Sequence, residues 1–290
     1  MMMLVLSGIL QGIVSGIVIA AVAAGMSLIY RVSHVTNFLH GSLLALALYV
    51  TLDLSRRFAI DPLYFSIPMV PIMGLVGLAL YWTLIRPVRR RHHLLLVQLL
   101  LGASFVVDSL LLMRYGADLQ SVGNSLSSRF VSILGTGFGL NELFASAISA
   151  LALCMLAAAV NLSDWGRKFR AVASDELASR LAGVSVEGVE AVSWMTGIAM
   201  LGLIAPAMAG VVTLTPDMGL HHTVLALVTM IVGGMGSLAG TILAGILVGV
   251  AQSLGLLFLP GSYGALLPYA LLVAVLIFRP AGVASIMGRV

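Results

Sequence analysis

The sequence predicts an all-α integral membrane protein, a polytopic helical bundle of about eight or nine transmembrane segments with broken or re-entrant helices. Three observations predict this class. Hydrophobic residues make up 60% of the chain and charged residues only 9%, and the mean hydropathy is +1.12. The apolar residues form uninterrupted runs of about twenty, long enough to cross a bilayer as helices. The 31 glycines predict close helix packing, because lipid tails provide no hydrophobic drive between helices.

Nine apolar segments fill most of the chain, and each is expected to be a helix. Two of them are doubtful as complete spans. The segment 34–53 opens with polar residues, and the segment 221–235 is short and ends in glycines. No change of composition separates a second domain, so residues 1–290 are expected to form one transmembrane domain. The nine segments are 5–30, 34–53, 63–85, 94–113, 143–162, 191–214, 221–235, 238–258 and 264–278.

Lysine and arginine predict the orientation, because cytoplasmic loops of membrane proteins carry an excess of both. One threading places eleven of the fifteen basic residues on the same side, with the densest cluster at 86–91. It predicts an external N-terminus and a cytoplasmic C-terminus, with a long external loop at about 114–142. The basic residues left outside are Arg56, Arg57, Arg114 and Arg129.

A polar segment at 163–190 interrupts the apolar chain and holds nine charged residues. Its signals predict one short capped helix: Ser174 as N-cap, Gly183 as the residue that closes the C-terminus, and a Glu176–Arg180 pair one turn apart. Two interpretations are open, a connector resting on the lipid headgroups or a helix that presents one face to a soluble partner. Apolar residues repeat every four positions in this segment and form a narrow stripe on one helix face: Phe169, Ala173, Leu177 and Leu181.

Several polar residues and glycines lie within or beside the apolar segments, where polar groups are costly and often functional. They could line a translocation path or allow a helix to break, and the alternative is that they cap a helix and fix it to its neighbours. Asp108 is the one acid well inside a predicted span. These candidates are Thr36, Asn37, His40, Gly41, Asp108, Gly233, Gly234, Gly236 and Ser237.

A weak internal repeat is visible. A helix of small residues at 16–30 precedes a polar break and then Gly41-Ser42-Leu43. A second such helix at 197–214 precedes another break and then Gly236-Ser237-Leu238. Paired, interrupted segments of this kind are typical of transporters with a site near the middle of the membrane.

The chain offers little for catalysis. Neither a Gly-x-x-x-x-Gly-Lys-Ser/Thr loop, a His-Glu-x-x-His motif nor a Gly-x-Ser-x-Gly motif occurs. The one cysteine, Cys154, excludes an internal disulfide and is expected to pack in the bundle. Without such motifs, no enzyme activity, cofactor or metal is expected. No nucleic-acid partner is expected either, because the net charge of +4 comes from loop arginines. Two functions remain: a transport subunit driven by a separate ATPase, and a self-contained secondary transporter or channel. The second is expected to have several acids within the membrane, and Asp108 is the one such acid in the predicted spans.

Four motifs together resemble the permease subunits of branched-chain amino-acid ABC importers of the LivH type. The sequence Val35-Thr36-Asn37-Phe38-Leu39-His40-Gly41 is similar to the family's Asn-Phe-Ala-His-Gly signature. Asp164-Trp165-Gly166-Arg167, continued by Arg170-Ala171, Asp175, Ala178 and Gly183-Val184, resembles its cytoplasmic segment. The runs 233–240 and 279–282 match its C-terminal patterns. The likeness covers nearly the whole chain, although Ser42 stands where the family often has an acid and Asp108 where it usually has an uncharged residue.

This resemblance implies an ABC-importer permease in a bacterial inner membrane. It implies two cytoplasmic ABC ATPase subunits, a second related permease or a second copy of the chain, and a periplasmic solute-binding protein. The solutes implied are branched-chain amino acids, urea, short amides or aromatic acids. ATP-driven closure of the partner is expected to push on 165–183, so that substituting Gly166 or Arg170 uncouples hydrolysis from uptake. The ATPase-coupling residues implied are Trp165, Gly166, Arg167, Arg170, Asp175, Glu176, Arg180 and Gly183.

Overall fold

The computed structural model describes residues 2–89, 93–123, 129–133 and 136–284. Helices dominate this part of the chain, and β1 and β2 form an antiparallel hairpin. In chain order the elements are α1 (Met2–Ser33), α2 (His40–Phe58), η1 (Pro62–Phe65), α3 (Ser66–Leu80), η2 (Tyr81–Ile85), α4 (Arg86–Val88), α5 (His93–Tyr115), β1 (Phe130–Ile133), β2 (Thr136–Gly139), α6 (Leu140–Leu162), α7 (Asp164–Ser174), α8 (Glu176–Leu181), α9 (Val186–Met208), α10 (Met218–Gly233), α11 (Leu238–Phe258), η3 (Gly261–Leu266) and α12 (Leu267–Phe278).

The all-α membrane bundle is confirmed, and each of the nine apolar segments coincides with a helix or a chain of helical turns. Six helical stretches of the described residues are long and apolar enough to cross a membrane, and α10 and α12 are shorter apolar helices. The count of eight or nine is therefore approximate. The helix expected from residue 34 begins only at His40, because residues 34–37 are non-helical and His34 adopts a left-handed backbone with φ of 52°.

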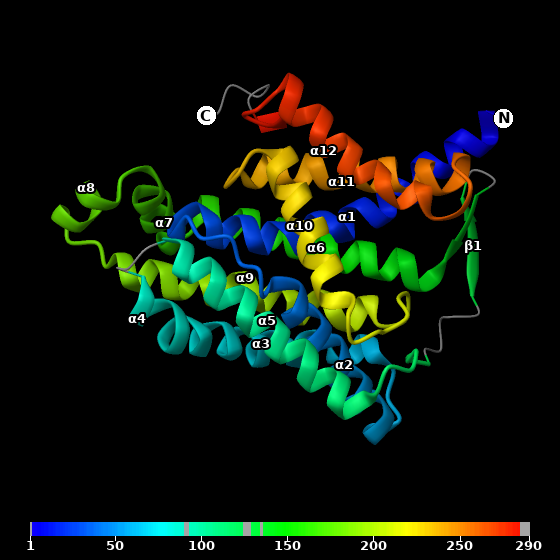
Figure 1. Cartoon of the computed structure of the whole chain (residues 1–290), viewed down its shortest axis with the longest axis horizontal. Coiled ribbons are helices and arrows are strands. Elements are labelled where there is room, and N and C mark those ends of the chain that lie inside the picture. The colour runs from blue at the N-terminus through cyan, green and yellow to red at the C-terminus, as the bar shows by residue number, and fades with distance from the viewer. Residues whose placement is uncertain (1, 90–92, 124–128, 134–135, 285–290) are drawn as a thin grey trace.

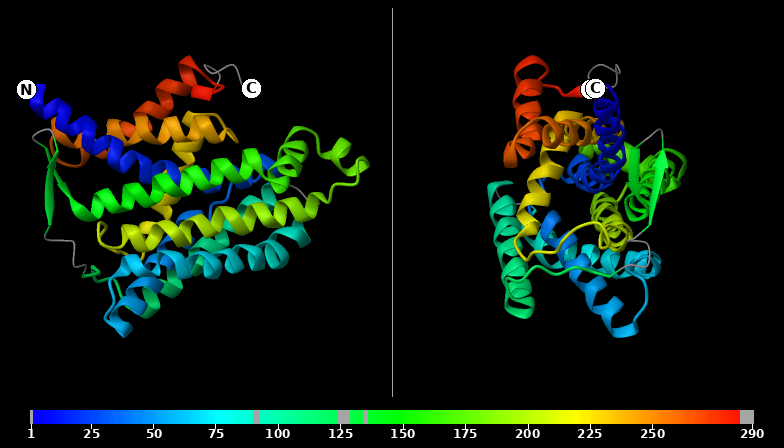
Figure 2. Two further views of the ribbon diagram at one scale, coloured as in Figure 1. Left: turned by 180° about the vertical axis from the view of Figure 1, so that it is seen from behind. Right: turned by 90° about the vertical axis from the view of Figure 1, so that its right-hand side faces the viewer.

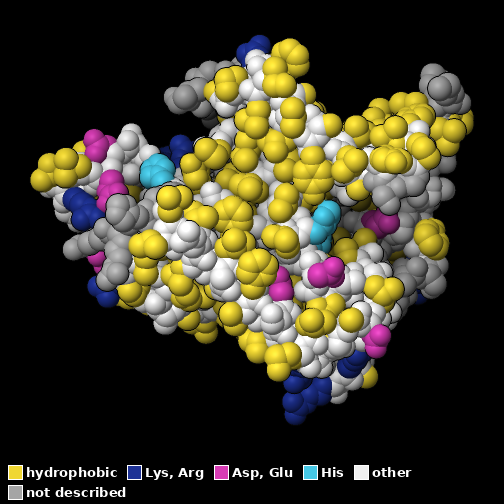
Figure 3. Space-filling model, viewed as in Figure 1, with side chains coloured by type: hydrophobic (Ala, Val, Ile, Leu, Met, Phe, Trp, Pro, Cys, Tyr) yellow, Lys and Arg dark blue, Asp and Glu magenta, His cyan; other side chains and the backbone are white. Residues whose placement is uncertain are grey.

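The long helices run roughly along one direction (Figure 1). The N-terminus and β1 lie at one end, and α7 and α8 lie at the other. Seen from behind, α6 and α9 run side by side (Figure 2). The sequence did not predict the hairpin, which falls within the loop expected at 114–142. Hydrophobic side chains cover most of the face shown in Figure 3, as expected for a surface in contact with lipid or another apolar partner.

The packing divides the bundle into two interlocked halves. Helix α1 packs along α11, and α9 packs in the same way along α3; α2 contacts α9, and α10 contacts α1. Helix α5 packs on α2, and α12 packs on α10 in the corresponding place of the other half. Helix α6 contacts both α1 and α9. This pattern pairs α1, α2, α3 and α5 with α9, α10, α11 and α12, as in a structural repeat.

Close glycine contacts occur where the two halves meet. A Cβ added to Gly25 of α1 would lie 2.5 Å from the carbonyl oxygen of Gly197 in α9, and one added to Gly197 would lie 2.7 Å from that of Gly25. The repeat seen in the sequence is thus correct for its first helices. Its second part was wrong, because Gly41 at the start of α2 faces Gly219 at the start of α10, and Gly236 precedes α11.

Small residues also allow α1 and α11 to approach closely. A Cβ on Gly12 would lie 2.5 Å from Cα of Val250, and one on Gly249 would lie 2.4 Å from the carbonyl oxygen of Gly12. The glycine content therefore acts in packing, as the composition predicted. Cys154 differs from its prediction, since it is exposed on α6 and not packed inside the bundle.

Candidate functional site

The polar segment 163–190 forms two helices instead of one. Helix α7 is capped by Ser163, whose hydroxyl accepts a hydrogen bond from the Gly166 N–H at 2.9 Å. Helix α8 is capped by Asp175, whose carboxylate accepts from the Ala178 N–H at 2.9 Å. The prediction of Ser174 as the N-cap was wrong, because the chain remains helical through Ser174 and becomes extended at Asp175.

The end of α8 agrees with the sequence. Gly183 has a φ of 80°, a left-handed conformation that glycine adopts without the cost of a Cβ. The N–H groups of Gly183 and Val184 donate to the carbonyls of Arg180 and Ser179, both at 3.0 Å, which closes the helix. The predicted Glu176–Arg180 pair is also present, with an N···O distance of 2.6 Å.

Helix α7 is fixed to the end of α6. A Cβ on Gly166 would lie 2.2 Å from the carbonyl oxygen of Val160, so only glycine fits at this contact. The guanidinium of Arg170 donates to the same carbonyl. The rings of Trp165 and Phe169 pack with centroids 5.3 Å apart, and Phe169 is fully buried. Gly166 and Arg170, which the sequence analysis assigned to coupling, therefore hold α7 in place.

Helix α8 exposes the rest of the predicted apolar stripe. The stripe divides at Asp175: Phe169 in α7 is 1% exposed, whereas Leu177 and Leu181 in α8 are 69% and 82% exposed. Since these leucines are four residues apart, they lie on one face of the helix. Arg167 in α7 is exposed and pairs with Asp164. The surface offered at this end of the molecule is thus an apolar face of α8 surrounded by charges.

An ionic network connects α8 to the interior. Nη2 of Arg89, which follows α4, lies 3.0 Å from Glu176 in α8 and 2.6 Å from Glu190 in α9. Glu190 is 1% exposed and also accepts a hydrogen bond from the Tyr81 hydroxyl at 3.0 Å. Sequence reasoning missed this site because it began the helix at 191. The helix begins at Val186, which places the carboxylate of Glu190 inside the bundle.

The start of α2 is fixed to both of its neighbours. Nε2 of His40 lies 2.9 Å from the Val22 carbonyl oxygen in α1, and the Gly41 N–H donates to Oγ1 of Thr223 in α10 at 2.9 Å. A Cβ on Gly41 would lie 2.1 Å from the carbonyl oxygen of Gly219. Asn37 is buried and caps the first turn through the Leu39 N–H at 3.1 Å. Thr36 is half-buried beside it.

The glycines at 233–236 lie at the opposite end of α10. Gly234 and Gly236 adopt left-handed φ values of 95° and 81°, and together they turn the chain into α11. Ser237 caps α11 by accepting a hydrogen bond from the Gly240 N–H at 3.2 Å. The Arg31 guanidinium donates to the Gly236 carbonyl at 3.1 Å. The predicted path residues thus form two groups, one at each end of α10, with Asp108 beside the group at its start.

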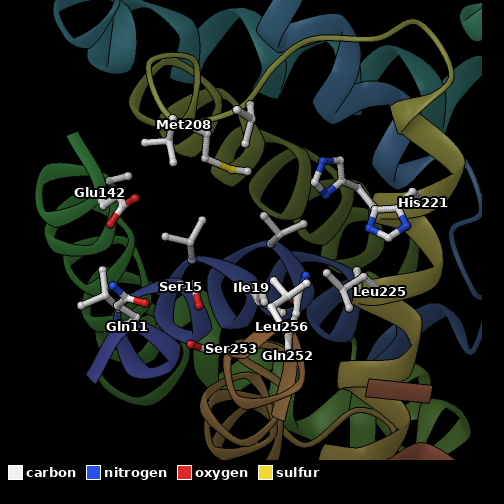
Figure 4. Close-up of a pocket in the computed structure, with 18 residues that line it drawn as sticks. Gln11, Ser15, Ile19, Glu142, Met208, His221, Leu225, Gln252, Ser253 and Leu256 are labelled. Atoms are coloured by element: carbon white, nitrogen blue, oxygen red, sulfur yellow. The ribbon is translucent and has the colours of Figure 1, made fainter. Parts of the chain in front are cut away.

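A cavity of about 440 Å³ lies between α1, α6, α10, α11 and the residues that follow α9 (Figure 4). None of the predicted path residues lines it. The signal available in the sequence was polar residues inside apolar runs, such as Gln11 and Gln252. Among the described residues there is no group of three or more side chains able to hold a metal ion. The polar side chains of the lining are Gln11, Ser15, Glu142, His221, His222, Gln252 and Ser253.

Comparison with known proteins gives one consistent result. Residues 8–276 match the family described as branched-chain amino acid transport system / permease component. The permease protein BraD of a high-affinity branched-chain amino acid transport system in Pseudomonas aeruginosa is 24% identical, covering 93% of this chain and 91% of its own. The probable branched-chain amino acid transport permease LivH of Methanocaldococcus jannaschii is 28% identical, covering 91% and 88%.

A solved structure agrees on the fold. PsaBC from Streptococcus pneumoniae, determined in complex with Fab, matches with a TM-score of 0.54. The match covers 96% of this chain and 94% of that chain. Because the identity is 13%, this likeness concerns the fold alone.

Proposed function

The chain belongs to the family of permease components of branched-chain amino acid transport systems, and from this we propose that it is the transmembrane permease subunit of a binding-protein-dependent ABC importer. In this proposal it moves branched-chain amino acids or a related small polar solute inward. ATP hydrolysis on separate subunits drives the movement. The relatives named above are themselves branched-chain amino acid transport permeases.

The observation that carries the ATP-driven part of the proposal is the surface of α8. Leu177 and Leu181 are large, exposed apolar side chains on the helix that carries the Glu176–Arg180 ion pair. Exposed apolar side chains rimmed by charges are typical of a protein-binding surface. We propose that a cytoplasmic ATPase binds this face and that α7, fixed to α6, transmits its movement to the bundle.

The partners follow from the same premise. An importer of this type contains two ATPase subunits, two permeases and a periplasmic solute-binding protein, so we propose a second related permease or a second copy of this chain. We further propose that the protein lies in a bacterial inner membrane with its N-terminus outside and its C-terminus in the cytoplasm. The grouping of basic residues supports this orientation, although Arg90, Arg91 and Arg289 of that grouping lie outside the described residues.

Two regions are proposed for the solute route. The first is the polar cavity between α1, α6, α10 and α11, whose volume of about 440 Å³ is in the range of small-molecule sites. The second is the junction of α2 and α10, where the Gly41 N–H donates to the Thr223 hydroxyl and His40 fixes the start of α2 to α1. Interrupted helices near the middle of a repeated fold are where transporters bind their solutes.

The alternative is a self-contained secondary transporter or channel, favoured by the acid Asp108 within α5. Purification of the tagged chain from its native membrane, followed by mass spectrometry, separates the two. We expect an ATPase and a second permease to copurify, and uptake into proteoliposomes of the purified complex to require internal ATP. Uptake by the chain alone, driven by an ion gradient without ATP, would contradict the proposal.

A further inference from the structure

An acid and a serine from different helices meet where α2, α5 and α10 come together. Oδ1 of Asp108 in α5 and Oγ of Ser42 in α2 lie 2.7 Å and 2.8 Å from the position that a Cβ on Gly219 would occupy. Ser42 is fully buried. The two side chains are close enough to interact with each other, but within the described residues neither oxygen has a hydrogen-bond partner of acceptable geometry. The missing side chain of Gly219 thus leaves room for two polar atoms that are unsatisfied.

A second acid lies close to this point. Asp217 ends the turn before α10, two residues ahead of Gly219, whose added Cβ would lie 2.7 Å from Oδ1 of Asp108. Asp217 is exposed, and its carboxylate makes no capping hydrogen bond to α10. Of the basic side chains that the structure describes, none forms an ion pair with Asp108 or Asp217.

The nearest arginine along α5 is already engaged. Arg114 lies six residues beyond Asp108 and pairs with Asp53 of α2 at 2.8 Å. The Tyr115 hydroxyl donates to the same carboxylate at 2.7 Å, and its ring stacks on Tyr49 with centroids 4.4 Å apart. The α2–α5 contact is therefore neutralised at its outer end. Deeper in the bundle it carries negative charge without a cation.

We propose that Asp108, Ser42 and Asp217 bind the ammonium group of the transported solute, an inference that rests on the proposed transport function. Unsatisfied acceptor oxygens from separate helices match an ammonium, which offers three donors and a positive charge. A divalent metal fits less well, since Ca²⁺ takes six to eight oxygen ligands. Oδ1 of Asp108 is closed to solvent, while the residue as a whole is partly buried and Asp217 is exposed, so the ammonium would reach the carboxylate from the face shared by α5 and α10.

The face shown in Figure 3 is consistent with access. Acidic and histidine side chains lie among the hydrophobic side chains near the middle of this face, which α5 and α10 cross in the same view (Figure 1). His221, which also lines the cavity between α1, α6, α10 and α11, is exposed on the first turns of the helix that follows Asp217. A solute with both an ammonium and a carboxylate would find acceptors at Asp108 and donors on α10.

The test uses the purified full-length chain in lipid nanodiscs and dicyclohexylcarbodiimide, which labels carboxyl groups in apolar surroundings. Mass spectrometry measures the rate of labelling at Asp108 with methylammonium, L-leucine or L-lysine present, and with potassium chloride or 4-methyl-2-oxopentanoate, the analogue of leucine without an ammonium. We expect the three ammonium compounds to slow labelling roughly tenfold, as for one charged hydrogen bond. Potassium and the oxo acid should have no effect.

Two serine variants distinguish binding at this site from a general change in the reactivity of Asp108. Ser42→Ala should abolish most of the protection, whereas Ser149→Ala, which alters a buried and unpartnered serine on α6, should leave it unchanged. Protection by no ammonium compound, or equal protection by potassium, overturns the inference. ATP-driven uptake by the wild-type complex is measured separately. Its absence would refute the proposed function whatever the labelling gives, and uptake without protection would refute only the ammonium site.

Discussion

Nη2 of Arg89 lies 2.6 Å from Oε1 of Glu190, and this contact joins the residue that follows α4 to a carboxylate buried in α9. The same guanidinium nitrogen lies 3.0 Å from Glu176 in α8. One arginine therefore connects the surface helix to the interior of the bundle. A displacement of α8 would change the surroundings of a buried charge, which gives the two helices an energetic link.

Replacing Glu190 with glutamine is expected to loosen this link. The substitution leaves Arg89 without its buried anion and should cost about 1–3 kcal/mol of stability. The midpoint temperature of thermal unfolding in detergent should fall, and trypsin should cleave the chain faster after Arg180. The control is Glu187→Gln, because Glu187 pairs with Arg86 near the surface, where such a pair contributes about 0–1 kcal/mol. Equal effects of the two variants would contradict a special role for Glu190.

Gly166→Ala is expected to destabilise the protein as well as to impair coupling. The added methyl group would lie 2.2 Å from the Val160 carbonyl oxygen, so α7 must move away from α6, at a cost of about 1–3 kcal/mol for overpacking. Gly183→Ala is the comparison. Nothing lies within 4 Å of its added Cβ, and only the left-handed backbone is strained, by about 1–2 kcal/mol. Limited proteolysis of α7 should distinguish them, with faster cleavage in Gly166→Ala alone.

The exposed leucines of α8 are expected to decide ATPase binding. The double substitution Leu177→Glu and Leu181→Glu removes the apolar face without touching a buried contact, so thermal stability should be unchanged. Copurification of the ATPase should drop at least about tenfold, because burying two leucines contributes several kcal/mol to an interface. Leu119→Glu, at a leucine 72% exposed on the predicted external side, is the control. Undiminished copurification by the double variant would refute the docking face.

Local sequence signals predicted much of this region because they depend on neighbouring residues. The left-handed Gly183 and the Glu176–Arg180 pair need only one helical turn to form. The choice between Ser174 and Asp175 as N-cap was different, since both are good caps. It depends on where α7 ends, and α7 is positioned by its contacts with α6.

Contacts between distant parts of the chain could not be read in the same way. Arg89 and Glu190 are each ordinary charged residues near the end of an apolar segment, and the local sequence around either residue does not predict a contact with the other. The cavity was missed for a similar reason: Gln11 and Gln252 are single polar residues in α1 and α11, and only the antiparallel packing of these helices brings them together. The sequence predicted the helices, and tertiary packing determined the sites.

Thr223 is expected to be important for the junction of α2 and α10. Thr223→Val keeps the volume but removes the acceptor of the buried Gly41 N–H, at a cost of about 1–3 kcal/mol. Thr229→Val is the matched control on the same helix, because the Thr229 hydroxyl donates only to the Leu225 carbonyl one turn earlier. The midpoint temperature of thermal unfolding should decrease more for Thr223→Val than for Thr229→Val. Similar decreases would mean that the hydrogen bond between α2 and α10 adds no stability.

The cavity gives the last prediction. Ser15 in α1 is exposed to the cavity, so Ser15→Trp should fill part of its volume of about 440 Å³ while leaving the packed face of α1 intact. If the solute passes through this space, uptake by the reconstituted complex should fall at least about tenfold with little change in thermal stability, because a bulky ring excludes a ligand from a preformed pocket. Ser109→Trp places the same ring on an exposed position of α5 outside the cavity and should retain uptake. Normal uptake by Ser15→Trp would exclude the cavity from the route and leave the α2–α10 junction, where Asp108 lies, as the path to test.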